Sequence, residues 1–231
     1  MGTGLLHRYE EEWNALLRNQ SAKSVGGEEP TNPLLLNVPS AYCSADYRVM
    51  IFGQETNDWW GIFPHDGGVD HMLNAYQKFY TEGECYSYGG QFWNGVSRLI
   101  DALRAKLEPA GKTMAVAWDN LIKIGKANGK GLPNRAILDW EDRWFDVVPL
   151  EVNELNPDLV IFFSGPNYDR FIIRAFHDAV FEGINARPVR HLARVKSARL
   201  PTNSIRTYHP NYSWRHGFYE YLTEIVGAID F

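Results

Sequence analysis

The sequence has only two cysteines, Cys43 and Cys85, and no long uninterrupted run of apolar residues. Two widely spaced cysteines without a CxxC pair exclude a disulfide framework and a four-thiolate metal site. A membrane-spanning helix needs roughly 18 consecutive apolar residues, which the chain does not offer. The first residues also lack the basic-then-apolar pattern of a signal peptide. We therefore expect a cytoplasmic protein that makes no membrane contact.

Three motifs that are common in α/β proteins are also missing. The chain contains no GxSxG, no GxxxxGK and no GxGxxG, which excludes the usual serine hydrolases, P-loop proteins and dinucleotide-binding enzymes. Two histidines and two aspartates lie near each other in a Gly-rich stretch, at His65, Asp66, Asp70 and His71. They lack the tight spacing of metal ligands, so we expect no metal and no other cofactor.

The chain alternates segments with strand-like and helix-like patterns of apolar residues. Predicted strands cover Tyr47–Phe52, Thr113–Trp118, Asp158–Phe163 and Ser204–Tyr208. Predicted helices cover Leu5–Asn19, Val69–Tyr80, Gln91–Leu107, Asp139–Leu155, Tyr168–Val180 and Ser213–Ile229. Such alternation is typical of a three-layer α/β/α fold, with a central, mainly parallel sheet of four to five strands.

Length and composition favour one domain over the whole chain, 1–231. With 231 residues, of which 45% are hydrophobic, the chain can fill one large core. The Gly- and Pro-containing segment SAKSVGGEEPTNP follows the first predicted helix. We therefore expect residues 1–33 to form a helical arm on a main body of residues 34–231, and we expect a monomer.

The net charge of −5 argues weakly against a nucleic-acid-binding protein, but charge is unevenly distributed along the chain. No Asp or Glu occurs between Gly183 and Tyr219, a segment that contains Arg187, Arg190, Arg194, Lys196, Arg199, Arg206 and Arg215. Such a run is often a solvated face. Beside a binding site it would be a candidate strip for phosphate groups.

Each predicted strand is followed by a small or polar cluster. In chain order these clusters are GQETN (53–57), Asp119-Asn120, SGPN (164–167) and HPNY (209–212). Ligands of parallel sheets bind beyond the carboxyl ends of the strands, so these clusters should converge on one crevice. Single polar residues here can equally be helix caps, which would account for Ser164, Asn167 and Asn211. Capping accounts less well for a carboxylate, an amide and an imidazole together.

These motifs, in this order, resemble those of the uracil-DNA glycosylase superfamily. GQETN is similar to the first family motif, GQDPY in one branch and GEAPG in the iron–sulfur branch; HPNYSWR is similar to the last, which begins HPS. Between them, DNLIKIGKANGKGLPNR followed by LNPDLVIFFSG resembles the TNVVKCRPP, NR and KPKVVVALG segments of the iron–sulfur branch. The match runs from about Tyr47 to Phe231.

The resemblance implies a DNA glycosylase that flips a base out of DNA and hydrolyses its N-glycosidic bond, with water as the nucleophile, in base-excision repair. Glu55 would hold the water and stabilise the sugar cation, and His209 would donate to the departing base. Gln54, Phe92 and Asn120 would bind the base, with Phe92 stacking on its ring. Phe92 could equally be a core residue at a helix start.

The resemblance also implies a DNA-contacting set around the crevice, formed by Ser164, Asn167, Asn211, Tyr212 and Arg215. Tyr212 would be a wedge that replaces the flipped base, or else an anchor of the last helix. The cluster cysteines of the iron–sulfur branch are missing, with Ile124 at one of their positions. No iron–sulfur cluster should bind.

Two departures from the family motif leave other functions open. Glu55 stands where the GQDPY branch has Asp, and the extra methylene moves the carboxylate by about 1.5 Å, a shift that can cost on the order of 100-fold in rate. Asn57 stands at the position of the Tyr that excludes thymine. The alternatives are a divergent family member that binds a nucleobase or nucleic acid without cleaving it, and a hydrolase of another class that acts on nucleotides or nucleosides.

Overall fold

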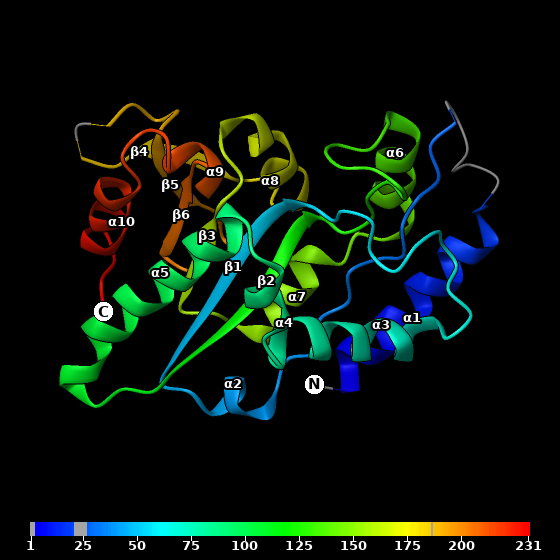
Figure 1. The fold of residues 1–231 in the computed structure, drawn as a ribbon, viewed down its shortest axis with the longest axis horizontal. Coiled ribbons are helices and arrows are strands. Elements are labelled where there is room, and N and C mark those ends of the chain that lie inside the picture. The colour runs from blue at the N-terminus through cyan, green and yellow to red at the C-terminus, as the bar shows by residue number, and fades with distance from the viewer. Residues whose placement is uncertain (1–2, 21–26, 186) are drawn as a thin grey trace.

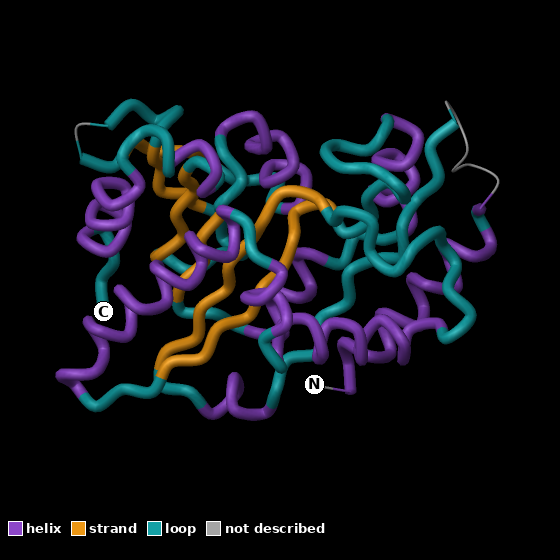
Figure 2. The backbone as a smooth tube through the Cα atoms, viewed as in Figure 1, coloured by secondary structure: helices purple, strands orange, loops and turns teal. Residues whose placement is uncertain are grey.

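The computed structural model describes residues 3–20, 27–185 and 187–231, and its centre is a six-stranded sheet in the order β2-β1-β3-β6-β5-β4 (Figures 1 and 2). The first four of these strands run parallel to one another, whereas β5 and β4 are antiparallel to their neighbours. The bounds are Tyr47–Glu55 (β1), Met114–Ile122 (β2), Leu159–Phe162 (β3), Val180–Gly183 (β4), Leu192–Lys196 (β5) and Asn203–Thr207 (β6). The α/β class is confirmed, but the expected number of four to five strands is too low.

The missing strands are the hairpin β4–β5 at the edge of the sheet. The predicted helix Tyr168–Val180 was expected to end where β4 begins, and no element was predicted over the rest of the hairpin; the helix itself, α8, covers only Asp169–Ala175. β4 is largely exposed, and its Glu182 forms an ion pair with Lys196 of β5. An exposed edge strand carries little apolar alternation, so the pattern of hydrophobic residues did not indicate it.

Helices cover both faces of the sheet. α5 (Gln91–Leu107) crosses the near side in Figure 1, where Trp93 packs on Trp118 of β2 at 5.0 Å between ring centroids. α7 (Val148–Leu155) lies on the opposite face, where Glu151 contacts Lys123. The remaining α-helices are α2 (Ser40–Ser44), α3 (Gly68–Tyr76), α4 (Glu84–Tyr88) and α6 (Arg135–Trp144), with α9 (Pro210–Ser213) and α10 (Phe218–Gly227) near the C-terminus.

Two of the predicted helices are interrupted in the structure. The segment Asp139–Leu155 is divided between α6 and α7, and Pro149 lies in the first turn of α7. Proline is tolerated there but not in a helix interior, because it has no backbone N–H. The segment Ser213–Ile229 is interrupted at Gly217, whose φ of +92° favours glycine.

The N-terminal helix α1 (Thr3–Arg18) agrees closely with its prediction. Tyr9, Trp13 and Leu16 are buried, and α1 contacts α3, α6 and α7, so this arm contributes to the core of the main body. The first part of the predicted connector, residues 21–26, lies outside the described residues. Within the described ranges, every helix is too short or too polar to cross a membrane.

Candidate active site at the carboxyl ends of the parallel strands

The strands β1 and β2 extend further than expected, so two of the predicted loop clusters lie within the sheet. Gly53, Gln54 and Glu55 end β1, and Gly53 is paired in register with Asn120 of β2. Side chains alternate between the faces of a sheet. Gly53, Glu55 and Asn120 therefore share the face covered by α5, and Gln54 points to the other face.

Phe92 and His209 complete this group of residues. A Cβ atom added to Gly53 would lie 2.3 Å from Oδ1 of Asn120 and 3.3 Å from the ring of Phe92, so only glycine fits between them. Phe92, in the first turn of α5, stacks on His209 with 5.5 Å between ring centroids and 26° between planes. The sheet and α5 thus bring the predicted amide, aromatic ring and imidazole together.

The side-chain amide of Asn120 is held by a hydrogen bond from its nitrogen, while its oxygen is available to a ligand. Its Nδ2 donates to Oγ1 of Thr56 at 3.3 Å, and its backbone N–H donates to the carboxylate of Asp119 at 2.7 Å. Within the described part of the chain, Oδ1 accepts no hydrogen bond from another residue. The amide can therefore accept from a ligand, and its second N–H can donate to one.

Glu55 is a buried carboxyl group, with 9% of the residue exposed. Its Oε2 accepts a short hydrogen bond from the hydroxyl of Tyr168, in the segment between β3 and α8. Burial raises the pKa of Glu55 above its usual range, although the hydrogen bond from Tyr168 and the charge of Lys126 oppose this. A carboxyl group with a raised pKa is a candidate for proton-transfer chemistry.

His209 is uncharged near neutral pH. Burial lowers its pKa to about 4. Its Nδ1 accepts the backbone N–H of Asn211 at 3.1 Å, which assigns the proton of the neutral ring to Nε2. No partner for Nε2 occurs among residues 3–20, 27–185 and 187–231, so this N–H can donate to a bound molecule.

Gln54 and Ser164 connect the end of β1 to the loop after β3. Nε2 of Gln54 donates to the backbone oxygen of Ser164 at 2.7 Å and joins the end of β1 to the loop after β3. Ser164 is buried, and its hydroxyl contacts no partner within the described residues. The hydrogen bond between them joins these two segments, and the predicted base contact of Gln54 and DNA contact of Ser164 stay predictions.

The other predicted DNA-contacting residues lie on the surface around the site. Asn167, Asn211, Tyr212 and Arg215 are all exposed. The ring of Tyr212 packs on Tyr208 at 4.1 Å and on His216 at 4.2 Å, and Nε of Arg215 donates to the backbone oxygen of Asn211 at 3.2 Å. Tyr212 is therefore both accessible to a ligand and an anchor of its own loop.

Most of the basic side chains in the segment Gly183–Tyr219 form ion pairs or hydrogen bonds with other residues of the protein. Arg206 is fully buried, where it binds Asp169 and two backbone oxygens. Arg187 binds Glu224 at 2.8 Å, and Lys196 binds Glu182 at 2.6 Å. Arg194 donates to two backbone oxygens. The segment Gly183–Tyr219 is therefore not a continuous strip of free cations.

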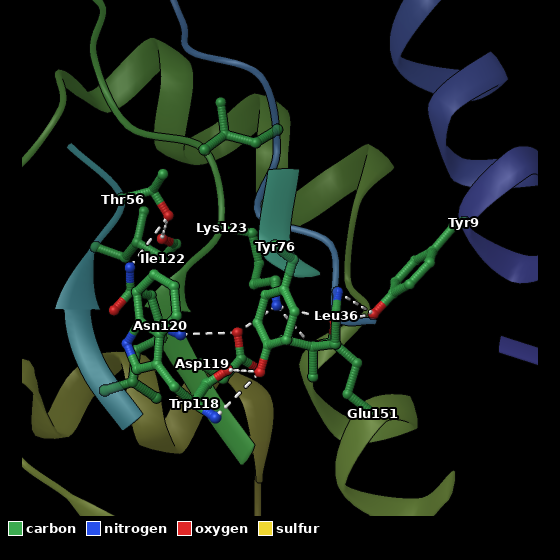
Figure 3. A network of polar contacts seen from close by, with 12 residues as sticks. Tyr9, Leu36, Thr56, Tyr76, Trp118, Asp119, Asn120, Ile122, Lys123 and Glu151 are labelled. Atoms are coloured by element: carbon green, nitrogen blue, oxygen red, sulfur yellow. Dashed lines mark hydrogen bonds and ion pairs between the residues drawn. The ribbon is translucent and has the colours of Figure 1, made fainter. Parts of the chain in front are cut away.

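Beneath the site lies a buried ionic network that the sequence did not indicate (Figure 3). Nζ of Lys123 contacts the carboxylate of Asp119, and it lies 2.9 Å from both carboxylate oxygens of Glu151. Tyr9 reaches in from α1 and donates to Glu151. All four side chains are buried. A sequence signal was the spacing of four residues between Asp119, in β2, and Lys123, directly after the end of β2.

The described residues contain no group of three or more His, Cys, Asp or Glu side chains that could hold a metal ion. His65 and His71 lie against each other with 3.8 Å between ring centroids, a stacked arrangement rather than a ligand set. An open hollow of about 490 Å³ lies beside Phe92 and is lined by Gln91, Asn94, Ser97, Arg98 and Trp214. Glu55 does not line it.

The chain matches no protein-family model, and it matches no curated protein. The resemblance to uracil-DNA glycosylases therefore rests on the four sequence motifs.

Proposed function

We propose that this protein is a DNA glycosylase that hydrolyses the N-glycosidic bond of uracil or a related damaged base. One observation carries the proposal: Phe92, Asn120 and His209 converge around Gly53, two residues before the buried Glu55. An aromatic face, an amide, a neutral imidazole and a carboxylate are what the removal of a planar base requires.

The base would bind against Phe92 and Asn120. The ring of Phe92 stacks on a flat base, and the amide of Asn120 offers one donor and one acceptor to its edge. His209 then donates from Nε2 to the oxygen on which negative charge collects as the base departs. A neutral imidazole suits this role, because its pKa of about 4 keeps it uncharged while it still carries the N–H.

Glu55 would act on the sugar side of the broken bond. Its free oxygen, Oε1, orients the attacking water, and the charge of the carboxylate stabilises the oxocarbenium-like sugar. Only the ionised form can do both. Because burial raises the pKa of Glu55, we expect the rate to fall on the acid side of neutrality as this carboxylate takes up a proton.

One observation favours the alternative of a nucleobase-binding module without hydrolysis. Because its pKa is raised, a smaller fraction of Glu55 is ionised at a given pH than of an exposed glutamate. A binding module needs the base contacts of Phe92 and Asn120 but not an ionised Glu55.

The test is base release from an oligonucleotide with a single uracil, detected by alkaline cleavage at the abasic site. We expect Glu55→Gln to lower the rate roughly 100- to 10,000-fold and His209→Ala to lower it roughly 100- to 1,000-fold. Glu182→Gln and His7→Ala are matched controls, because both residues are exposed and distant in the fold from the site. No release from single strands, U:G pairs or U:A pairs would refute the uracil assignment. Binding without release would favour the module.

A further inference from the structure

The carboxyl group of Glu55 is held by a residue outside the recognised motifs. Tyr168 lies in the short turn between β3 and α8, and its hydroxyl donates to Oε2 of Glu55. Oε1 has no partner within the described ranges. The hydrogen bond therefore fixes the orientation of the carboxylate and leaves one oxygen free.

This contact bears on the main departure from the family motif. Glutamate at position 55 is longer than aspartate by one methylene, about 1.5 Å, and it has an additional rotatable bond. A carboxylate on a longer and more flexible side chain needs an external contact to keep one position. The hydroxyl of Tyr168 supplies such a contact.

The backbone around Tyr168 is itself fixed. Gly165, with φ of +75°, begins the turn, and its N–H donates to the backbone oxygen of Thr207 in β6 at 2.9 Å. The N–H of Tyr168 donates back to Gly165 at 3.1 Å, and its ring packs on Phe171 at 5.4 Å. Gln54 joins the same loop to β1. The turn that carries the hydroxyl is thus held by contacts to two strands, β1 and β6, and to α8.

Few other charges act on this pair. Lys126, in the segment after β2, lowers the pKa of Glu55, but its Nζ is also 3.5 Å from Glu28. Arg170 lies near Tyr168, with its guanidinium over the ring of Phe171 at 4.7 Å. The pKa of Tyr168 is raised by burial and by Glu55, so the phenol keeps its proton and remains the donor.

We propose that Tyr168 is a positioning residue that holds the carboxylate of Glu55, the residue assigned to the attacking water, through one oxygen. The effect of Tyr168 on catalysis rests on the proposed glycosylase function. The contact between Tyr168 and Glu55 can be tested without any measurement of activity. Tyr168 stabilises the ionised form of Glu55 by donating to it, so its loss moves the protonation of Glu55 to higher pH.

The experiment compares Tyr168→Phe, which keeps the ring and removes the hydroxyl, with Tyr219→Phe as a matched control on an exposed tyrosine. The first measurement is the titration of Glu55 by NMR of protein labelled at the glutamate carboxyl carbons, with Glu55→Gln identifying the signal. We expect the midpoint to move to higher pH in Tyr168→Phe and to stay in place in Tyr219→Phe. An unchanged midpoint in Tyr168→Phe would overturn the proposal.

The second measurement is the pH profile of uracil release. For Tyr168→Phe we expect kcat/KM to fall about 10- to 100-fold, as for the loss of a hydrogen bond to a charged group, and the acid limb to move to higher pH with the NMR midpoint.

Glu55→Asp should also lose activity, and adding Tyr168→Phe to it should change the rate less than two-fold, because the shorter side chain does not reach the hydroxyl. A full additional loss would overturn the proposal. A shifted NMR midpoint in a protein that releases no base would support the contact and refute the glycosylase function.

Discussion

Two neighbouring residues of β2, Asp119 and Asn120, lie in opposite surroundings. Asp119 faces α7, where its carboxylate is bound by Lys123 in a network closed by Glu151 and Tyr9 (Figure 3). Asn120 faces α5, where its Oδ1 lies beside Gly53 and Phe92. On the Asp119 side of the strand end, the buried charged groups pair with one another, although Oδ2 of Asp119 has no hydrogen-bond partner within the described residues. On the Asn120 side, the amide keeps hydrogen-bonding groups that a ligand could use.

Whether a buried polar side chain is paired within the protein therefore indicates its role better than its residue type does. Buried charges are tolerated when they are paired, and breaking such a pair is costly. Burial and the nearby Glu151 carboxylate raise the pKa of Asp119 well above its usual range, and the buried Lys123 has a raised pKa, because its two acidic partners outweigh the effect of burial. We therefore assign the Asp119 face to stability and the Asn120 face to binding.

The largest effect on stability should come from Lys123→Met, which keeps the size of the side chain and removes its charge. Asp119 and Glu151 would then be buried without a cation, and we expect a loss of about 3–5 kcal/mol in the free energy of unfolding. Urea denaturation at pH 7 measures it. The loss should be smaller at lower pH, where the carboxyl groups take up protons and need no cation.

Lys126→Met is the matched control for this change. Lys126 is close in sequence but partly exposed, and its ion pair with Glu28 is 3.5 Å long. Its removal should cost less than about 1 kcal/mol. Equal losses for the two lysines would mean that the Asp119 face is not a closed network and would remove the contrast between the two faces.

On the site face, His209 should make stability depend on pH. Its pKa is about 4 in the folded protein and near 6.5 when unfolded, so the unfolded chain binds the proton first as pH falls. The contribution of the neutral His209 to the free energy of unfolding is therefore fully present above pH 6.5. It is lost as the pH falls from 6.5 towards 4, by up to about 3 kcal/mol. Unfolding of wild type and His209→Ala at several pH values measures the difference. A difference that stays constant with pH would contradict the burial of a neutral imidazole.

Tyr9→Phe should cost about 1–3 kcal/mol, because it leaves the backbone N–H of Leu36 without its partner and removes one of the two donors to Oε1 of Glu151. Chemical denaturation gives the value. Uracil release per folded molecule should remain unchanged, since Tyr9 lies on the Asp119 side of the sheet. A selective loss of release with normal stability would link the two faces.

The sequence predicted the four parallel strands and the polar residues Glu55, Asn120 and His209 at or beyond their carboxyl ends, because apolar strands and the polar residues that follow them are local patterns. It did not predict the hairpin β4–β5, of which β4 is largely exposed and carries no such pattern, whereas β5 is short and mostly buried. It also did not predict that Arg206 is buried against Asp169, or that Tyr168 binds Glu55. These contacts join residues that are 37 and 113 positions apart, and only the packed fold brings them together.

Among the buried residues of the two faces, Asn120→Ala should have the smallest effect on stability. The side chain makes one hydrogen bond, to Thr56 at 3.3 Å, and otherwise faces the site. We expect a loss of less than about 1.5 kcal/mol, typical of one hydrogen bond, together with a large loss of affinity for DNA that contains uracil and little change for undamaged DNA. Denaturation and fluorescence anisotropy measure the two quantities on the same preparation. A destabilisation as large as that of Lys123→Met would place Asn120 with the structural face, whereas a stable variant with selectively weaker binding would sharpen the division between Asp119 and its neighbour.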